Sequence, residues 1–83
     1  MKCTRYFEEQ VLRQRPYIDP TACVAVIALP LRRVVQSNGG MRHRGRVIDR
    51  RDGTMRMLRV VTPDDGETIH NAFCDRGFRE DGT

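Results

Sequence analysis

The sequence contains no tryptophan, and only 6% of its residues are aromatic. Proteins that bind single-stranded nucleic acid without sequence preference stack successive bases on aromatic side chains. Three phenylalanines and two tyrosines provide little material for such a surface. The composition therefore argues against binding that is dominated by base stacking.

The chain also lacks a long apolar run. The longest one, residues 22–31, is interrupted by Pro30 and is shorter than the roughly 18 residues of a membrane span. The N-terminal residues lead directly into charged sequence, without the apolar region of a secretory signal. We expect a cytoplasmic protein that makes no contact with a membrane.

The sequence has only three cysteines, and their spacing fits no motif of paired cysteines. The three residues Cys3, Cys23 and Cys74 match neither a disulfide framework nor the ligand spacing of a zinc site. Cys23 is expected to be a small buried apolar residue, with the other two near the surface. No paired motif supports a catalytic cysteine, and we expect no metal and no cofactor.

The length of 83 residues predicts one domain over residues 1–83, with residues 1–3 and 80–83 frayed. A chain this short buries only about 60–65% of the surface that it exposes when unfolded. Its core must be thin. A functional site is therefore expected on the surface rather than in a deep enclosed cavity.

Lysine is almost absent, because fourteen of the fifteen basic residues are arginine. Residues 32–59 hold nine arginines against two aspartates, a local balance of +7, whereas the whole chain has a net charge of +4. A GC-rich genome would favour arginine over lysine, but it would not gather the arginines in one segment. Guanidinium groups bind phosphates with two parallel hydrogen bonds, which makes an anionic partner the functional interpretation.

Two helices are expected in the first third. Thr4 can cap the first, whose apolar residues are Phe7, Val11 and Leu12, and Pro16 ends it. Asp19-Pro20 is a strong start for the second, which Pro30 ends.

The remaining sequence alternates between strands and turns. The expected strands are Leu31–Ser37, Met41–Ile48, Thr54–Thr62 and Glu67–Phe73. The turns between them are predicted by Asn38-Gly39, Asp49–Gly53 and Pro63–Gly66. The predicted fold is α+β, with two N-terminal helices packed on a four-stranded antiparallel meander.

A two-residue turn at Asn38-Gly39 would pair Val34 with His43. Alternation along the strands then predicts one face that packs on the helices, with Val34, Met41, His43, Gly45 and Val47. The opposite face would be strongly basic and would carry Arg33, Val35, Arg42, Arg44 and Arg46. Like charges on one face destabilise a sheet, and a bound anion would relieve that repulsion.

Four-residue turns at Asp49–Asp52 and Pro63–Gly66 would align Arg42, Arg59 and His70 in one row across three strands. RNA cleavage without a metal needs groups that accept and donate protons and cations for the phosphate. Histidine can take either proton role, and arginine stabilises charge on phosphate. The alternative interpretation is a structural strand histidine beside a solvated arginine stripe.

The C-terminal segment adds Arg76 and Arg79. They could extend the nucleic-acid path that begins with Arg33, Arg44 and Arg46. Alternatively, they could pair with Asp75 and Glu80.

The segment Leu58-Arg59-Val60-Val61, followed by Thr68–Phe73 and preceded by two helices and Pro30, resembles small bacterial proteins related to RelE- and BrnT-type toxins. The resemblance is one of pattern and covers roughly residues 6–79. It implies a cytoplasmic, metal-independent endoribonuclease with Arg59 and His70 at its site, directed at RNA free or on the ribosome. It also implies an acidic protein antitoxin as partner. The chain departs from that pattern in the tail, where Phe78 and Arg79 stand in place of a tyrosine or a basic pair.

Three functions therefore remain open from the sequence. The first is an RNA-cleaving toxin with His70, Arg59 and Arg42 as catalytic residues. The second is a nucleic-acid-binding module without catalysis. The third is an interaction module whose basic face docks an acidic partner or a second copy of the chain.

Overall fold

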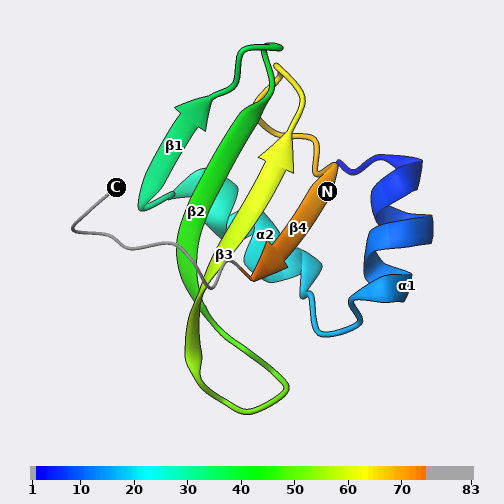
Figure 1. The fold of residues 1–83 in the computed structure, drawn as a ribbon, viewed down its shortest axis with the longest axis vertical. Helices are drawn as coiled ribbons and strands as arrows, with labels where there is room; N and C mark the ends of the chain where they lie inside the picture. The colour runs from blue at the N-terminus through cyan, green and yellow to red at the C-terminus, as the bar shows by residue number, and fades with distance from the viewer. Residues whose placement is uncertain (1, 75–83) are drawn as a thin grey trace.

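A computed structural model describes residues 2–74 and shows the expected α+β fold (Figure 1). Three helical segments come first: η1 (Phe7–Val11), α1 (Leu12–Gln14) and α2 (Pro20–Ala28). The strands follow as β1 (Arg32–Val35), β2 (Met41–Ile48), β3 (Met55–Thr62) and β4 (Asn71–Cys74). η1 and α1 run on from one another, so the chain forms two helices and then a sheet, as predicted.

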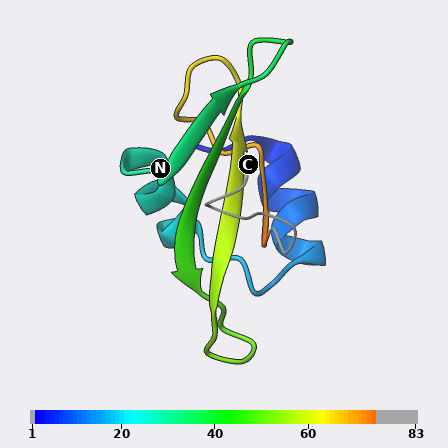
Figure 2. The same cartoon turned by 60° about the vertical axis from the view of Figure 1, so that its left-hand side comes forward.

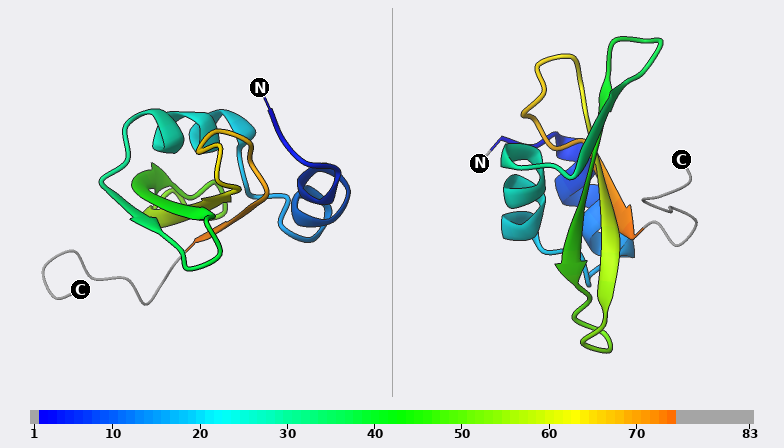
Figure 3. Two further views of the ribbon diagram at one scale, coloured as in Figure 1. Left: turned by 90° about the horizontal axis from the view of Figure 1, so that it is seen from above. Right: turned by 90° about the vertical axis from the view of Figure 1, so that its left-hand side faces the viewer.

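The four strands form one antiparallel sheet in the order β1-β2-β3-β4. α2 lies across one face of the sheet, and the first helix lies beside β4 at the sheet edge (Figures 2 and 3). No helix of residues 2–74 covers the other face (Figure 3). No helix in this part of the chain is long and apolar enough to cross a membrane.

Both helix starts form as the sequence predicts. The hydroxyl oxygen of Thr4 accepts the N–H of Phe7 at 3.1 Å. The Asp19 carboxylate accepts the N–H of Thr21 at 3.0 Å, and Pro20 occupies the first turn of α2, where its missing N–H is no loss. The first helix differs in its winding, because Phe7–Val11 adopts π-helical geometry.

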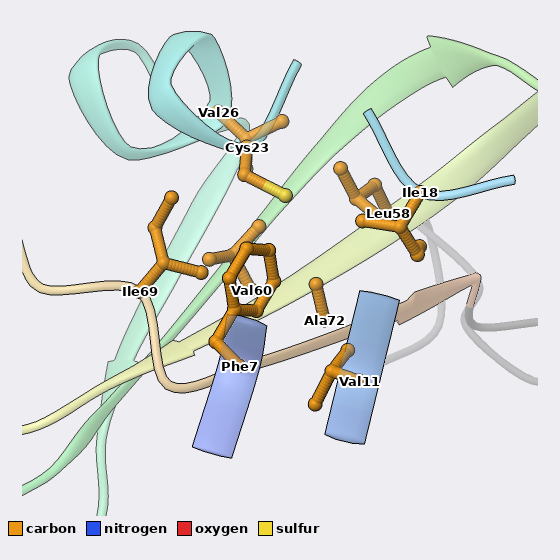
Figure 4. Close-up of a cluster of buried hydrophobic side chains, with 9 residues drawn as sticks. All are labelled: Phe7, Val11, Ile18, Cys23, Val26, Leu58, Val60, Ile69 and Ala72. Atoms are coloured by element: carbon orange, nitrogen blue, oxygen red, sulfur yellow. The ribbon is translucent and has the colours of Figure 1, made fainter. Parts of the chain in front are cut away.

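The core lies between α2, the first helix and the inner face of the sheet (Figure 4). Its buried side chains are Phe7, Val11, Ile18, Cys23, Val26, Leu58, Val60, Ile69 and Ala72. Gly45 allows α2 to approach β2 closely, since a Cβ at this position would lie 3.0 Å from a methyl group of Val26.

The β1–β2 hairpin has a different register from the predicted one. Its loop has three residues rather than two, because the N–H of Gln36 donates to the Gly40 carbonyl and Gly39 adopts a φ of 90°. Val34 therefore pairs with Arg42 instead of His43. This shift of one residue moves Arg33 and Val35 to the helix side of the sheet and places Val34 on the basic side, so that these three assignments were wrong.

The β2–β3 register differs from the predicted one by two residues. Because this number is even, each residue stays on the face of the sheet that was predicted for it. Arg42 pairs with Val61, and Arg59 pairs with Arg44 rather than with Arg42 as predicted. The connection is longer than the predicted turn, because strand pairing ends at Ile48 and Met55.

The buried Asp49 side chain organises this connection. It accepts hydrogen bonds from Arg51 at 2.6 Å and 3.0 Å, and Arg56 Nε forms an ion pair with it at 2.9 Å. The hydrogen bonds from Arg51 hold the pKa of Asp49 well below its usual range. The ion pairs explain why an aspartate can be buried at this position.

β4 starts later than predicted, at Asn71. Val60 pairs with Ala72 and Arg59 with Phe73, so the expected pairs with Ile69 and His70 do not form. The N–H of His70 donates to the Val61 carbonyl at 2.9 Å, although Asn71 is the ladder partner of Val61. Two consecutive residues thus face one residue of β3, as in a β-bulge.

The residues before the first helix contact the segment that precedes β4. Cys3 and Ile69 form a parallel bridge, in which Thr4 N–H donates to Ile69 and Ile69 N–H donates to Lys2. Lys2 also pairs with Glu67. These contacts join Lys2 and Cys3 to the segment that leads into β4.

His43 is fully buried on the helix side of the sheet, as the alternation of β2 predicts. Its Nε2 lies 3.1 Å from the Thr62 hydroxyl, whereas Nδ1 has no hydrogen-bond partner. Burial, with a smaller contribution from the charge of Arg33, lowers the pKa of His43 below its ordinary value. The native state therefore binds the imidazole proton less readily than the unfolded chain does.

This difference predicts acid sensitivity in the histidine range. Stability should be fully present above the unfolded pKa, and should fall as the pH drops from about 7 to 5, by at most about 1.4 kcal/mol per pH unit for one group. Urea unfolding at each pH would measure it. The slope should persist in a His70→Ala variant and disappear in His43→Phe. An unchanged slope in His43→Phe would contradict the assignment.

Candidate nucleic-acid interface

The sheet face turned away from α2, here called the outer face, is rich in arginine. Gly45, Leu58 and Val60 are buried and therefore lie on the face that contacts the core. Successive residues of a strand face opposite sides of a sheet, so the residues next to these three face outward. The register places five arginines on the outer face: Arg32, Arg42, Arg44, Arg46 and Arg59. The predicted common face of Arg42, Arg44, Arg46 and Arg59 is confirmed, and Arg32 replaces Arg33.

Phe73 forms an aromatic centre on the outer face next to β3. The guanidinium carbon of Arg59 lies 4.8 Å from the ring centroid, and that of Arg15 lies 5.7 Å away. Arg15 also donates to Asn71 at 3.4 Å, so the end of the first helix contributes a cation to the face. Neither Arg15 nor Phe73 was predicted for the site, because their contact arises only when the first helix packs beside β4.

Arg42 has a buried polar atom that lacks a partner. Its Nε is enclosed and makes no hydrogen bond in the described part of the chain. The Arg42 guanidinium forms no ion pair within residues 2–74, which leaves the charge of this outer-face residue to be met by an anion.

Three arginines of the basic segment serve the fold instead. Arg51 and Arg56 bind the carboxylates of Asp49 and Asp52, and Arg50 pairs with Asp19 at 3.1 Å. Arg51 also lies 3.8 Å above the ring of Tyr17. The local excess of positive charge thus divides between the β2–β3 connection, where aspartates neutralise it, and the outer face.

His70 lies at the N-terminal end of β4, beside the first helix. Its Nδ1 is 3.1 Å from the Thr4 hydroxyl, and its ring stacks on Tyr6 with 5.0 Å between centroids. The side chain is exposed, and within residues 2–74 Nε2 has no hydrogen-bond partner. Thr4 and Tyr6 therefore fix the ring and leave Nε2 directed to solvent.

The three predicted catalytic residues gather in one region but do not form a row. Arg42 and His70 lie on either side of Val61. Arg42 is its pairing partner in β2, and the N–H of His70 donates to the Val61 carbonyl. Their backbones are two strand spacings apart, about 10 Å. Arg59 lies two residues farther along β3, opposite Arg44.

Cys3 and Cys23 do not have the properties of nucleophiles. Cys23 is buried, and desolvation raises its pKa to about 12. Burial also raises the pKa of Cys3, which bonds to Glu8. Thiols with raised pKa values form little reactive thiolate at neutral pH. Among residues 2–74, no three His, Cys, Asp or Glu side chains are placed to hold a metal ion.

Arg76 and Arg79, the predicted extension of the site, lie outside the described residues. Compared with family models, curated proteins and solved structures, the chain has no match. The resemblance to RelE- and BrnT-type toxins therefore stays a prediction from the sequence pattern.

Proposed function

We propose that this protein binds RNA on the outer face and acts there as a metal-independent endoribonuclease of the toxin type. The observation that carries the proposal is the position of His70 at the margin of an arginine-rich sheet face. A positioned imidazole at the edge of a face that carries several guanidinium groups combines a proton carrier with phosphate binding. Arg42 is the primary phosphate ligand.

The reaction that fits these groups is attack of a 2′-hydroxyl on the adjacent phosphorus. Nε2 of His70 accepts the hydroxyl proton, the new P–O2′ bond forms and the P–O5′ bond breaks. Water protonates the leaving 5′ oxygen, and the resulting hydroxide takes the proton back from His70. The products are a 2′,3′-cyclic phosphate and a 5′-hydroxyl end. Arg42 and Arg59 stabilise the charge that develops on the phosphate.

The proposed partners follow from the same surface. An RNA substrate places the action of the protein in the cytoplasm, free or on the ribosome. An acidic antitoxin could neutralise the protein by presenting carboxylates to the outer-face arginines, which would compete with phosphate for the same donors.

Replacing Arg42 with alanine tests the binding surface. Removing one phosphate ligand should reduce the salt slope of binding to single-stranded RNA by about 0.7 and should weaken affinity uniformly across sequences. Titrations of labelled RNA at several salt concentrations would measure both. The matched control is Arg13→Ala, which removes one exposed arginine from α1, away from the outer face.

Equal slopes for wild type, Arg42→Ala and Arg13→Ala would contradict the outer face as the RNA surface. Retention of RNA without cleavage would favour a second function, a binding module without catalysis. The observation that favours this alternative is that the outer face has one exposed histidine at its margin and no second one among the described residues, since His43 is buried on the other side.

A further inference from the structure

An open surface pocket of about 420 Å³ lies beside His70. It lies where the β1–β2 loop meets the turn between β3 and β4. It is lined on one side by Gln36, Asn38 and Gly40, and on the other by Val61, Thr62, Pro63, Asp64 and His70. A cavity of this volume is large enough for one nucleobase.

Gly40 brings acceptor oxygens together in this pocket. A Cβ at Gly40 would lie 3.1 Å from both Gln36 Oε1 and the Thr62 carbonyl oxygen, and 3.2 Å from Asn38 Oδ1. Asn38 Oδ1 already accepts the N–H of Gly40 at 2.9 Å. The absence of a side chain at this position leaves room beside the Gln36 amide oxygen.

Asp64 adds a carboxylate to this acceptor set. Its Cβ lies 3.7 Å from the Cβ position of Gly39, so the two turns are in contact. Within residues 2–74 the Asp64 carboxylate is exposed and forms no ion pair or hydrogen bond, unlike the neighbouring Asp65, which binds the backbone of Glu67 and Thr68. Asp65 therefore holds the turn, while Asp64 is available to a ligand.

The Asp64 carboxylate, which only accepts hydrogen bonds, selects a ligand that presents N–H donors. Guanine is the base with two adjacent donors on its Watson–Crick edge, N1–H and the 2-amino group, which match the two oxygens of a carboxylate. Adenine and cytosine place one amino group beside an acceptor, and uracil has a single N–H. The Asp64 carboxylate thus favours guanine over the other three bases.

We propose that this pocket binds the guanine base of a nucleotide whose phosphate contacts the outer face. His70 lies in the wall of the pocket and at the margin of the outer face, so a bound base would place the adjoining phosphate beside the imidazole. The inference rests on the proposed function for its place in RNA cleavage. The binding of guanine itself can be tested without RNA.

The test compares the affinities of four nucleoside monophosphates that share the phosphate, namely 3′-GMP, 3′-IMP, 3′-AMP and 3′-UMP, by calorimetric or NMR titration. We expect 3′-GMP to bind about tenfold more tightly than 3′-AMP and 3′-UMP, because the carboxylate accepts two hydrogen bonds. 3′-IMP, which lacks the 2-amino group, should fall between them. The Asp64→Asn variant should bind 3′-GMP no more tightly than 3′-AMP. The control variant Glu9→Gln, which changes an exposed carboxylate on η1, should keep the preference for 3′-GMP.

The outcomes separate this inference from the proposed function. Equal affinities for the four nucleotides would overturn the guanine pocket, even if RNA is bound and cleaved. A preference for 3′-GMP that persists in Asp64→Asn would also overturn it. If RNA is neither retained nor cleaved while 3′-GMP is selected through Asp64, the pocket stands and the ribonuclease proposal fails.

Discussion

Replacing His70 with alanine is expected to reduce RNA cleavage by about 10²–10⁴-fold while leaving RNA retention nearly unchanged. The reduction is the contribution of one positioned general acid or base. Retention should persist because the proposal assigns phosphate binding to the arginines of the outer face and not to the imidazole. The measurement is the rate at which end-labelled RNA is cut, with the affinity determined on the same RNA.

Two further variants refine this experiment. Thr4→Val removes the hydroxyl that lies 3.1 Å from His70 Nδ1 and should lower the rate less than His70→Ala, with a changed pH profile. A mild effect is expected because Tyr6 still stacks on the ring. Arg13→Ala again serves as the control that should change neither rate nor affinity.

The outcome separates the enzymatic from the non-enzymatic interpretation. A wild-type protein that binds RNA but leaves it intact would show a binding module. A His70→Ala variant that cleaves as fast as the wild type would place the chemistry elsewhere. Growth of bacteria that express each variant gives an independent readout, since only the cleaving forms should be toxic.

The sequence predicts the elements of this fold well because their signals are local. The Thr4 cap, the Asp19-Pro20 start and the limits of β2 depend on neighbouring residues, and each agrees with the structure. The registers depend on loop conformation, which is less local. A single residue more in the β1–β2 loop moved Arg33 to the other face.

The candidate site was predictable only in part for the same reason. Arg42 and Arg59 share a face because the β2–β3 register changed by an even number of residues. His70 left the predicted row because a bulge at Val61 and the late start of β4 separate it from Arg59. Arg15 lies at the site because the first helix packs beside β4. The periodicity of the sequence does not indicate this packing.

Phe7 is the residue whose truncation should destabilise the protein most. Its side chain is completely buried in the core between the first helix and the sheet (Figure 4). Replacing a buried phenylalanine with alanine costs about 3–5 kcal/mol. A domain of this size has a total stability of only about 4–12 kcal/mol. Phe7→Ala should therefore lose a large part of the stability of the domain and unfold at a much lower urea concentration than the wild type.

This prediction links the core to the proposed site. Phe7 anchors the helix that begins at Thr4 and carries Tyr6, and these two residues hold the His70 ring. Phe7→Leu, which keeps most of the volume, should lose much less stability and retain the His70 contacts. If Phe7→Ala unfolds at the same urea concentration as Phe7→Leu, the helix is not anchored through this side chain. The rigidity of His70 would then have to come from the bulge in β4 and not from the first helix.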